Sequence, residues 1–137
     1  LERLGIEALA QRSYTQLSGG ERQLVLIARA LAQHSPVLLM DEPTANLDYG
    51  NQLRVLTKVR ALAGEGYAII QSTHNPEQSY LFSHRILAMR DGQVLANGAP
   101  REVLTAGLVR SLYGVDVEVE SLRGDQMRVC IPKDILE

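Results

Sequence analysis

Val37-Leu38-Leu39-Met40 is a short apolar run that is followed at once by Asp41-Glu42-Pro43. A continuous apolar run of this length predicts a strand that is buried on both faces, as in a parallel sheet. Such a strand delivers its carboxylates to its carboxyl end, where α/β sheets bind ligands. Neighbouring strand residues point in opposite directions, so Asp41 and Glu42 are expected to have different roles. One carboxylate can hold Mg²⁺, often through a bridging water, and the other can orient an attacking water.

The segments around this strand alternate between helical and strand patterns. The predicted helices cover residues 1–10, 19–33, 49–63, a short segment that opens at Asn75-Pro76, and 98–113. The predicted strands are 37–40, 67–72, the two arms around Asp91-Gly92, and a half-solvated pair within 115–131. This order predicts an α/β fold with a parallel sheet core and C-terminal β-hairpins.

Composition narrows the function classes. The chain has 137 residues, a formal charge of −2, 45% hydrophobic residues and 4% aromatic residues, which suits one globular unit. The near-neutral charge and the few aromatic residues disfavour a nucleic-acid binder. Cys130 is the single cysteine, so neither an internal disulfide nor a cysteine zinc site is expected. No apolar run is long enough to span a bilayer, and no segment has the pattern of a signal peptide.

Ser18-Gly19-Gly20-Glu21 precedes the second predicted helix. Serine followed three residues later by glutamate predicts a capping box at a helix N-terminus. Two glycines inside that turn allow a ligand to approach the backbone closely, and the free N–H groups favour an anion such as phosphate. The alternative is a well-capped helix that binds nothing.

His74 follows the second predicted buried strand. It is therefore expected at the same edge of the sheet as Asp41, where a neutral imidazole can hydrogen-bond a phosphate oxygen or a water. His34, at a helix end, and His84, before a strand, are interpreted as structural. Arg123-Gly124-Asp125 is interpreted as a hairpin turn rather than an adhesion tripeptide.

The order of these motifs resembles the ATPase subunit of the ATP-binding cassette (ABC) family, from residue 1 to about residue 104. Segment 17–23 resembles the family signature, 37–41 the Walker B strand, and 45–48 the D-loop. Glu42 matches the catalytic glutamate and His74 the switch histidine. The resemblance implies the C-terminal part of a P-loop (RecA-like) nucleotide-binding domain, with residues 1–16 ending a helical subdomain, 17–104 in the core, and 105–137 forming an extension.

The resemblance also implies roles. Two cassettes of this family enclose two ATP molecules, so ATP and Mg²⁺ are the implied cofactors. Asp41 would support Mg²⁺ through water, while Glu42 and His74 would be the catalytic residues, polarising water and contacting the γ-phosphate. The implied cofactor-binding residues are Ser18, Gly19, Gly20, Glu21 and Asp48, of which Asp48 would also touch the partner subunit.

Two features depart from the family pattern. Asn75 stands where the family often has Asp, although either residue can cap the next helix. The phosphate-binding loop Gly-x-x-x-x-Gly-Lys-Ser/Thr does not occur, because neither lysine, Lys58 or Lys133, follows a glycine. The chain is therefore expected to be the C-terminal part of a cassette and to be inactive alone, with the adenine-stacking residue and the Q-loop upstream.

The segment 92–104 is similar to importer ATPases, and Leu112-Tyr113-Gly114-Val115 before a charged hairpin resembles the subgroup importing iron-siderophore complexes, haem or vitamin B12. The implied partners are a second ATPase subunit, transmembrane permease subunits and, indirectly, a substrate-binding protein, without nucleic acid, at the cytoplasmic face of the membrane. Two alternatives remain: a lobe of a DNA-repair or chromosome-maintenance ATPase, and a non-catalytic half-cassette. A coiled coil before Leu1 would favour repair, and an upstream Walker A loop would favour transport.

Overall fold

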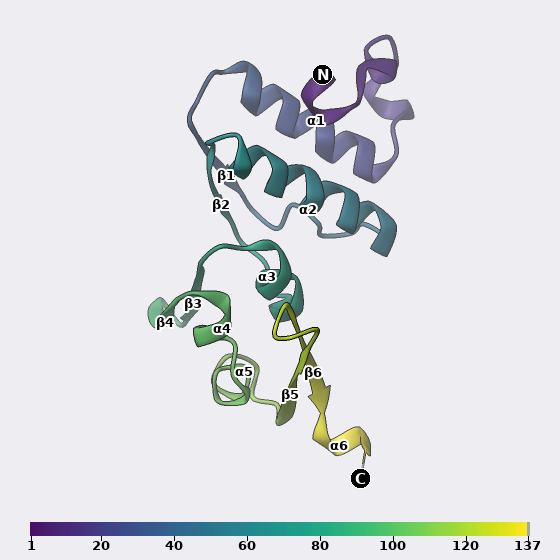
Figure 1. Cartoon of the computed structure of the whole chain (residues 1–137). Helices are drawn as coiled ribbons and strands as arrows, with labels where there is room; N and C mark the ends of the chain where they lie inside the picture. Colours follow the sequence, from purple (N-terminus) through teal and green to yellow (C-terminus); the bar gives the residue numbers. More distant parts are fainter. Residues whose placement is uncertain (137) are drawn as a thin grey trace. The chain divides into compact units, whose positions relative to one another are not determined.

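The computed structural model describes residues 1–136, and the chain divides into two compact units, one of residues 1–73 and one that begins at His74 (Figure 1). Each unit has its own buried core. The division into 1–16, 17–104 and 105–137 stays a prediction.

The first unit combines helices with a two-stranded parallel sheet. Its elements are η1 (Glu2–Leu4), η2 (Glu7–Leu9), η3 (Tyr14–Gln16), α1 (Gly19–Ala32), β1 (Val37–Met40), α2 (Tyr49–Gly64) and β2 (Ala68–Gln71). Val37 pairs with Ala68 and Met40 with Gln71, which confirms the parallel sheet predicted from the two apolar runs. The helices α1 and α2 pack against each other (Figure 1).

The prediction of a helix over residues 1–10 is wrong. Two short 3-10 turns, η1 and η2, take its place. Gly5 ends η1 with a φ of 66°, a left-handed conformation that interrupts a right-handed helix. Of the apolar residues at helical spacing that predict this helix, Leu1, Leu4 and Ala8, only Leu4 is buried, so they do not form one helix face.

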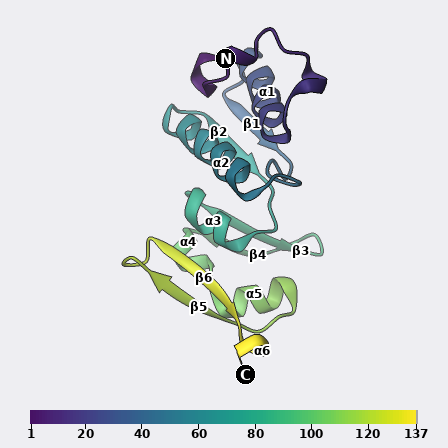
Figure 2. The same cartoon turned by 90° about the vertical axis from the view of Figure 1, so that its right-hand side faces the viewer.

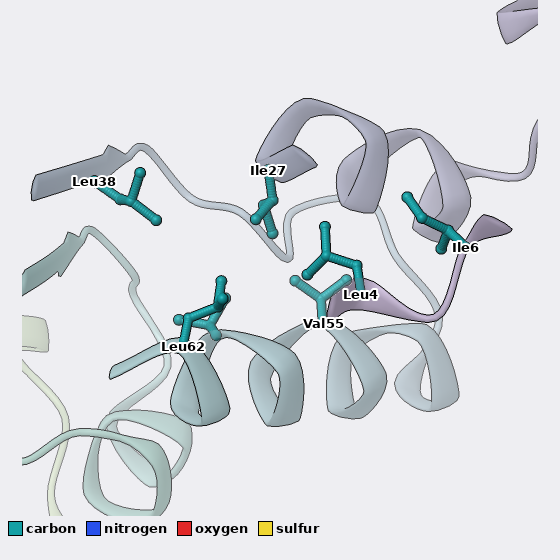
Figure 3. Close-up of a cluster of buried hydrophobic side chains, with 7 residues drawn as sticks. Leu4, Ile6, Ile27, Leu38, Val55 and Leu62 are labelled. Carbon is teal, nitrogen blue, oxygen red and sulfur yellow. The ribbon is translucent and has the colours of Figure 1, made fainter. Parts of the chain in front are cut away.

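A single apolar cluster holds the first unit together. Its buried members come from η1, the N-cap of η2, α1, β1 and α2, and they are Leu4, Ile6, Ile27, Leu38, Val55, Val59 and Leu62. Figure 3 shows the side chains of Leu4 and Ile27 pointing toward Val55 and Leu62 on α2. This cluster fixes α1 and β1 against α2, and so positions the residues that flank these elements.

The two faces of the parallel sheet differ sharply. Leu38 is 4% exposed, whereas Leu39 is 75% and Ile70 is 64% exposed. The prediction that these strands are buried on both faces is therefore wrong for the part of the chain that the structure describes. Helices of the first unit pack on one face of the sheet, and the apolar side chains on the other face are exposed.

The second unit contains two antiparallel hairpins and short helices. Its elements are α3 (Pro76–Phe82), β3 (Ile86–Arg90), β4 (Gln93–Gly98), α4 (Pro100–Val103), α5 (Ala106–Tyr113), β5 (Val117–Leu122), β6 (Met127–Pro132) and α6 (Lys133–Leu136). Both predicted hairpins are confirmed, and β6 packs beside α3 (Figure 2). The single helical stretch predicted over 98–113 is wrong, because Thr105 takes an extended conformation and caps a new helix, α5.

Polar contacts reinforce the core of this unit. Arg128 forms a two-pronged ion pair with Asp125, with Nε–Oδ1 at 2.7 Å and Nη2–Oδ2 at 2.9 Å, and its guanidinium stacks over the Tyr80 ring. The hydrogen bonds from Arg128 hold the pKa of Asp125 well below its ordinary value. Since this carboxylate is already bound internally, the contacts support the interpretation of residues 123–125 as a turn.

Candidate functional site

The N-terminus of α1 has the geometry that the sequence predicts. The Ser18 hydroxyl accepts a hydrogen bond from the Glu21 N–H at 3.2 Å, and the Glu21 carboxylate accepts one from the Ser18 N–H at 2.9 Å. This is a complete capping box, so the capping prediction is confirmed. Arg22 adds a further restraint, because it donates to the carbonyls of Tyr14 and Thr15 in η3.

The start of α2 packs closely against this turn. A Cβ placed on Gly20 would lie 2.5 Å from Oδ1 of Asn51. Asn51 is held by Asp48, whose carboxylate caps α2 by accepting from the Asn51 N–H at 2.9 Å and from its side-chain amide at 2.7 Å. Both hydrogen bonds lower the pKa of Asp48, and the one from the backbone N–H of Asn51 has the larger effect. The signature-like turn and the D-loop-like segment are therefore packed together through Asn51, a residue that the sequence reasoning missed.

Gly20→Ala is expected to destabilise the protein because the new methyl group collides with Asn51. Overpacking of this kind costs about 1–3 kcal/mol. Gly64→Ala is the matched control, since Gly64 also lies in a helix and a Cβ there would meet nothing within 4 Å. Urea unfolding monitored by circular dichroism compares the two variants. Equal stability of Gly20→Ala and the wild type would contradict the close packing.

The carboxyl end of β1 carries Asp41 and Glu42 beside the end of β2. The Ser72 hydroxyl donates to Oδ1 of Asp41 and accepts from the Glu42 N–H at 2.9 Å. Glu42 has a φ of 42°, which a residue with a side chain rarely adopts, and the hydrogen bond from its N–H helps to hold it there. One hydroxyl thus holds the carboxylate of Asp41 and the backbone of Glu42.

Ser72 was missed by the sequence reasoning, although a signal for it exists. In the parallel register Met40 pairs with Gln71, so the next residues along, Asp41 and Ser72, lie at the same edge of the sheet. Aligning the two predicted strands by their ends would have placed a hydroxyl beside the carboxylates.

The oxygen donors at this edge suit Mg²⁺, which proteins bind through one or two carboxylates together with water and substrate phosphates. Among the described residues, no group of three or more histidine, cysteine or acidic side chains could hold a metal alone. The Asp41 carboxylate is a ligand of the kind that Mg²⁺ takes when phosphates and water complete its coordination.

His74 begins the second unit. Its neighbour Asn75 caps α3 by accepting from the Gln78 N–H at 2.9 Å, which confirms the predicted cap. The His74 carbonyl accepts a hydrogen bond from the Tyr113 hydroxyl at 2.9 Å, a contact that the sequence reasoning missed. The placement of His74 at the same edge as Asp41 stays a prediction.

Comparisons with known proteins agree with these motifs. The profile of the ABC transporter family matches residues 1–45, which include the capping box, Asp41 and Glu42. An uncharacterized ABC transporter ATP-binding protein of Haemophilus influenzae is 45% identical over 119 residues, covering 87% of this chain and 45% of that protein. An iron(3+)-hydroxamate import ATP-binding protein of Bacillus subtilis is 36% identical over 138 residues, covering 100% of this chain and 51% of that protein.

Solved structures give the same result. A metal-chelate-type ABC transporter in an inward-facing conformation matches with a TM-score of 0.86 and 31% identity, covering 98% of this chain and 55% of that chain. The chain thus spans about half the length of the relatives it matches. The α/β fold with its parallel strand pair is that of part of an ABC nucleotide-binding domain, and the chain belongs to the family of ABC transporter ATP-binding proteins.

Proposed function

We propose that this chain is part of the ATP-hydrolysing subunit of an ABC importer, and that it contributes the signature turn, the acidic pair and the switch histidine. The observation that carries the proposal is the arrangement at the end of β1, where Ser72 holds Asp41 and the backbone of Glu42 beside each other. An acidic pair at the carboxyl end of a parallel strand is where an α/β sheet binds its ligand.

Each residue is proposed to have a separate role. Glu42 is suited to orient the attacking water, and Asp41 to hold a water ligand of Mg²⁺. ATP and Mg²⁺, when bound, supply the phosphoryl group and the charge that stabilises its transfer. Ser18, Gly19, Gly20 and Glu21 surround the N-terminus of a 14-residue helix, whose free N–H groups suit a γ-phosphate. His74 is proposed to contact the γ-phosphate of the nucleotide that Asp41 and Glu42 serve, and Asp48 to contact the partner subunit.

The same motifs support a proposal for how the ATPase subunit assembles with its partners. In the family, the signature turn and the acidic pair of one subunit serve different nucleotides, so we propose that two ATPase subunits work as a pair on transmembrane permease subunits. A metal chelate or related cofactor is the proposed cargo, because the Bacillus relative is named as an iron(3+)-hydroxamate importer subunit and the matching structure is of the metal-chelate type. A peripheral position on the cytoplasmic face of the membrane is proposed with it. No helix among the described residues is long and apolar enough to cross a bilayer.

The proposal is tested by Ser18→Asp in the full-length subunit assembled with its permease. Aspartate is as good a helix cap as serine, so stability is expected to be retained. Its negative charge would face the γ-phosphate, and ATP hydrolysis is expected to fall at least about tenfold, as for loss of an electrostatic contact in a dry site. Ser18→Ala separates the cap from the charge, since it costs about 1 kcal/mol of stability without adding charge.

Thr105→Asp is the matched control for this variant. The Thr105 hydroxyl caps α5 by accepting from the Leu108 N–H at 3.1 Å, and aspartate can replace it there. This control adds the same charge at a helix N-terminus outside the proposed site, so hydrolysis is expected to stay normal. Normal hydrolysis by Ser18→Asp as well would show that Ser18 is only a cap.

A further inference from the structure

We propose that Tyr113 is a positioning residue for His74, through which the C-terminal segment sets the orientation of the proposed switch histidine. The inference rests on the proposed function, because it gives His74 its role at the γ-phosphate. It starts from the hydrogen bond that the Tyr113 hydroxyl donates to the His74 carbonyl at 2.9 Å, across 39 residues of sequence.

Tyr113 is 44% exposed, but the helix that carries it is fixed in the second unit. Tyr113 is the last residue of α5, which Gly114 ends in a left-handed conformation with a φ of 71°. Val109 anchors α5 in the buried cluster with Tyr80, Leu104 and Val117, and Arg90 at the end of β3 donates to the Ser111 carbonyl. Partial burial raises the pKa of the Tyr113 hydroxyl, so the group remains a hydrogen-bond donor throughout the physiological pH range.

The backbone on the other side of His74 is also restrained. The Asn75 side chain caps α3, and the Glu77 carboxylate in the first turn of α3 accepts from the Cys130 N–H of β6 at 2.9 Å. The segment 74–77 is thus tied to α5 at one end and to β6 at the other. Fixing the carbonyl of His74 and the cap that follows it restricts the backbone dihedrals of His74, and with them the direction of its side chain.

The test measures ATP hydrolysis by the full-length subunit assembled with its permease. Tyr113→Phe removes only the hydroxyl, and kcat is expected to fall about 3–10-fold, the effect of one neutral hydrogen bond. KM for ATP is expected to stay unchanged, because no atom that binds ATP is removed. Tyr80→Phe is the matched control: it loses one hydrogen bond in the same unit, the 2.7 Å bond to the Asp125 carbonyl, and is expected to lower stability without lowering kcat.

A double-mutant cycle separates positioning from general stability. If Tyr113 acts through His74, adding Tyr113→Phe to His74→Ala causes no further loss in the single-turnover rate. An independent loss in that background, an equal kcat loss in Tyr80→Phe, or a normal kcat in Tyr113→Phe would each overturn the inference. Normal hydrolysis by His74→Ala would instead overturn the proposed role of His74, and the inference with it, so the two failures are distinguishable.

Discussion

Glu42→Gln in the full-length subunit is expected to lower ATP turnover by a factor on the order of 10²–10³ while ATP binding is retained. Glutamine keeps the shape of the side chain and one oxygen acceptor, and it removes the negative charge that polarises water. The backbone of Glu42 stays held through the Ser72 hydroxyl, because that hydrogen bond is made by the main-chain N–H. The loss is therefore expected in kcat, with little change in folding or in nucleotide affinity.

Steady-state phosphate release and titration with Mg-ATP measure the two quantities separately. Glu65→Gln is a suitable control, because Glu65 is an exposed carboxylate whose ion pair with Arg3 spans 3.8 Å and contributes little. Its turnover is expected to match the wild type. Near-normal hydrolysis by Glu42→Gln would show that another group activates the water.

Features set by neighbouring residues could be predicted from the sequence. The capping box of Ser18 and Glu21 and the cap at Asn75 each depend on a serine or asparagine placed three residues before its partner. The hairpin turn at Asp91-Gly92 depends on two residues that tolerate positive φ, and both adopt it. Such contacts are complete within one turn of chain, so the local pattern is sufficient.

Features set by distant residues were missed, because no local pattern marks them. The Ser72 hydroxyl reaches Asp41 across 31 residues, and Tyr113 reaches His74 across 39. Neither contact leaves a periodic pattern in the sequence, because each depends on how whole elements pack. The helix predicted over residues 1–10 failed for a related reason: Leu4 and Ile6 turn inward to the α2 core, and Gly5 permits the reversal between them.

The open face of the parallel sheet has a consequence for the isolated 137-residue chain. Leu39 and Ile70 expose apolar side chains there, and the two-stranded sheet leaves an outer edge on each strand. Exposed apolar faces and free strand edges promote association. The chain also has no phosphate-binding loop. We therefore expect the isolated chain to self-associate, to lack ATPase activity, and to bind Mg-ATP no more tightly than millimolar.

Leu39→Lys tests whether the open face of the sheet causes the self-association. Leu38→Lys is the matched control, because Leu38 lies one residue away on the opposite face. Lysine at position 39 would be exposed to solvent. The variant is expected to contain more monomer than the unmodified chain, measured by light scattering, with unchanged helix content. Lysine at position 38 would place an unpaired charge in the α2 core, which costs about 3–5 kcal/mol, and the first unit is expected to unfold. If the unmodified chain were a monodisperse monomer that bound Mg-ATP at micromolar concentration, both the open-face argument and the missing-loop argument would be wrong.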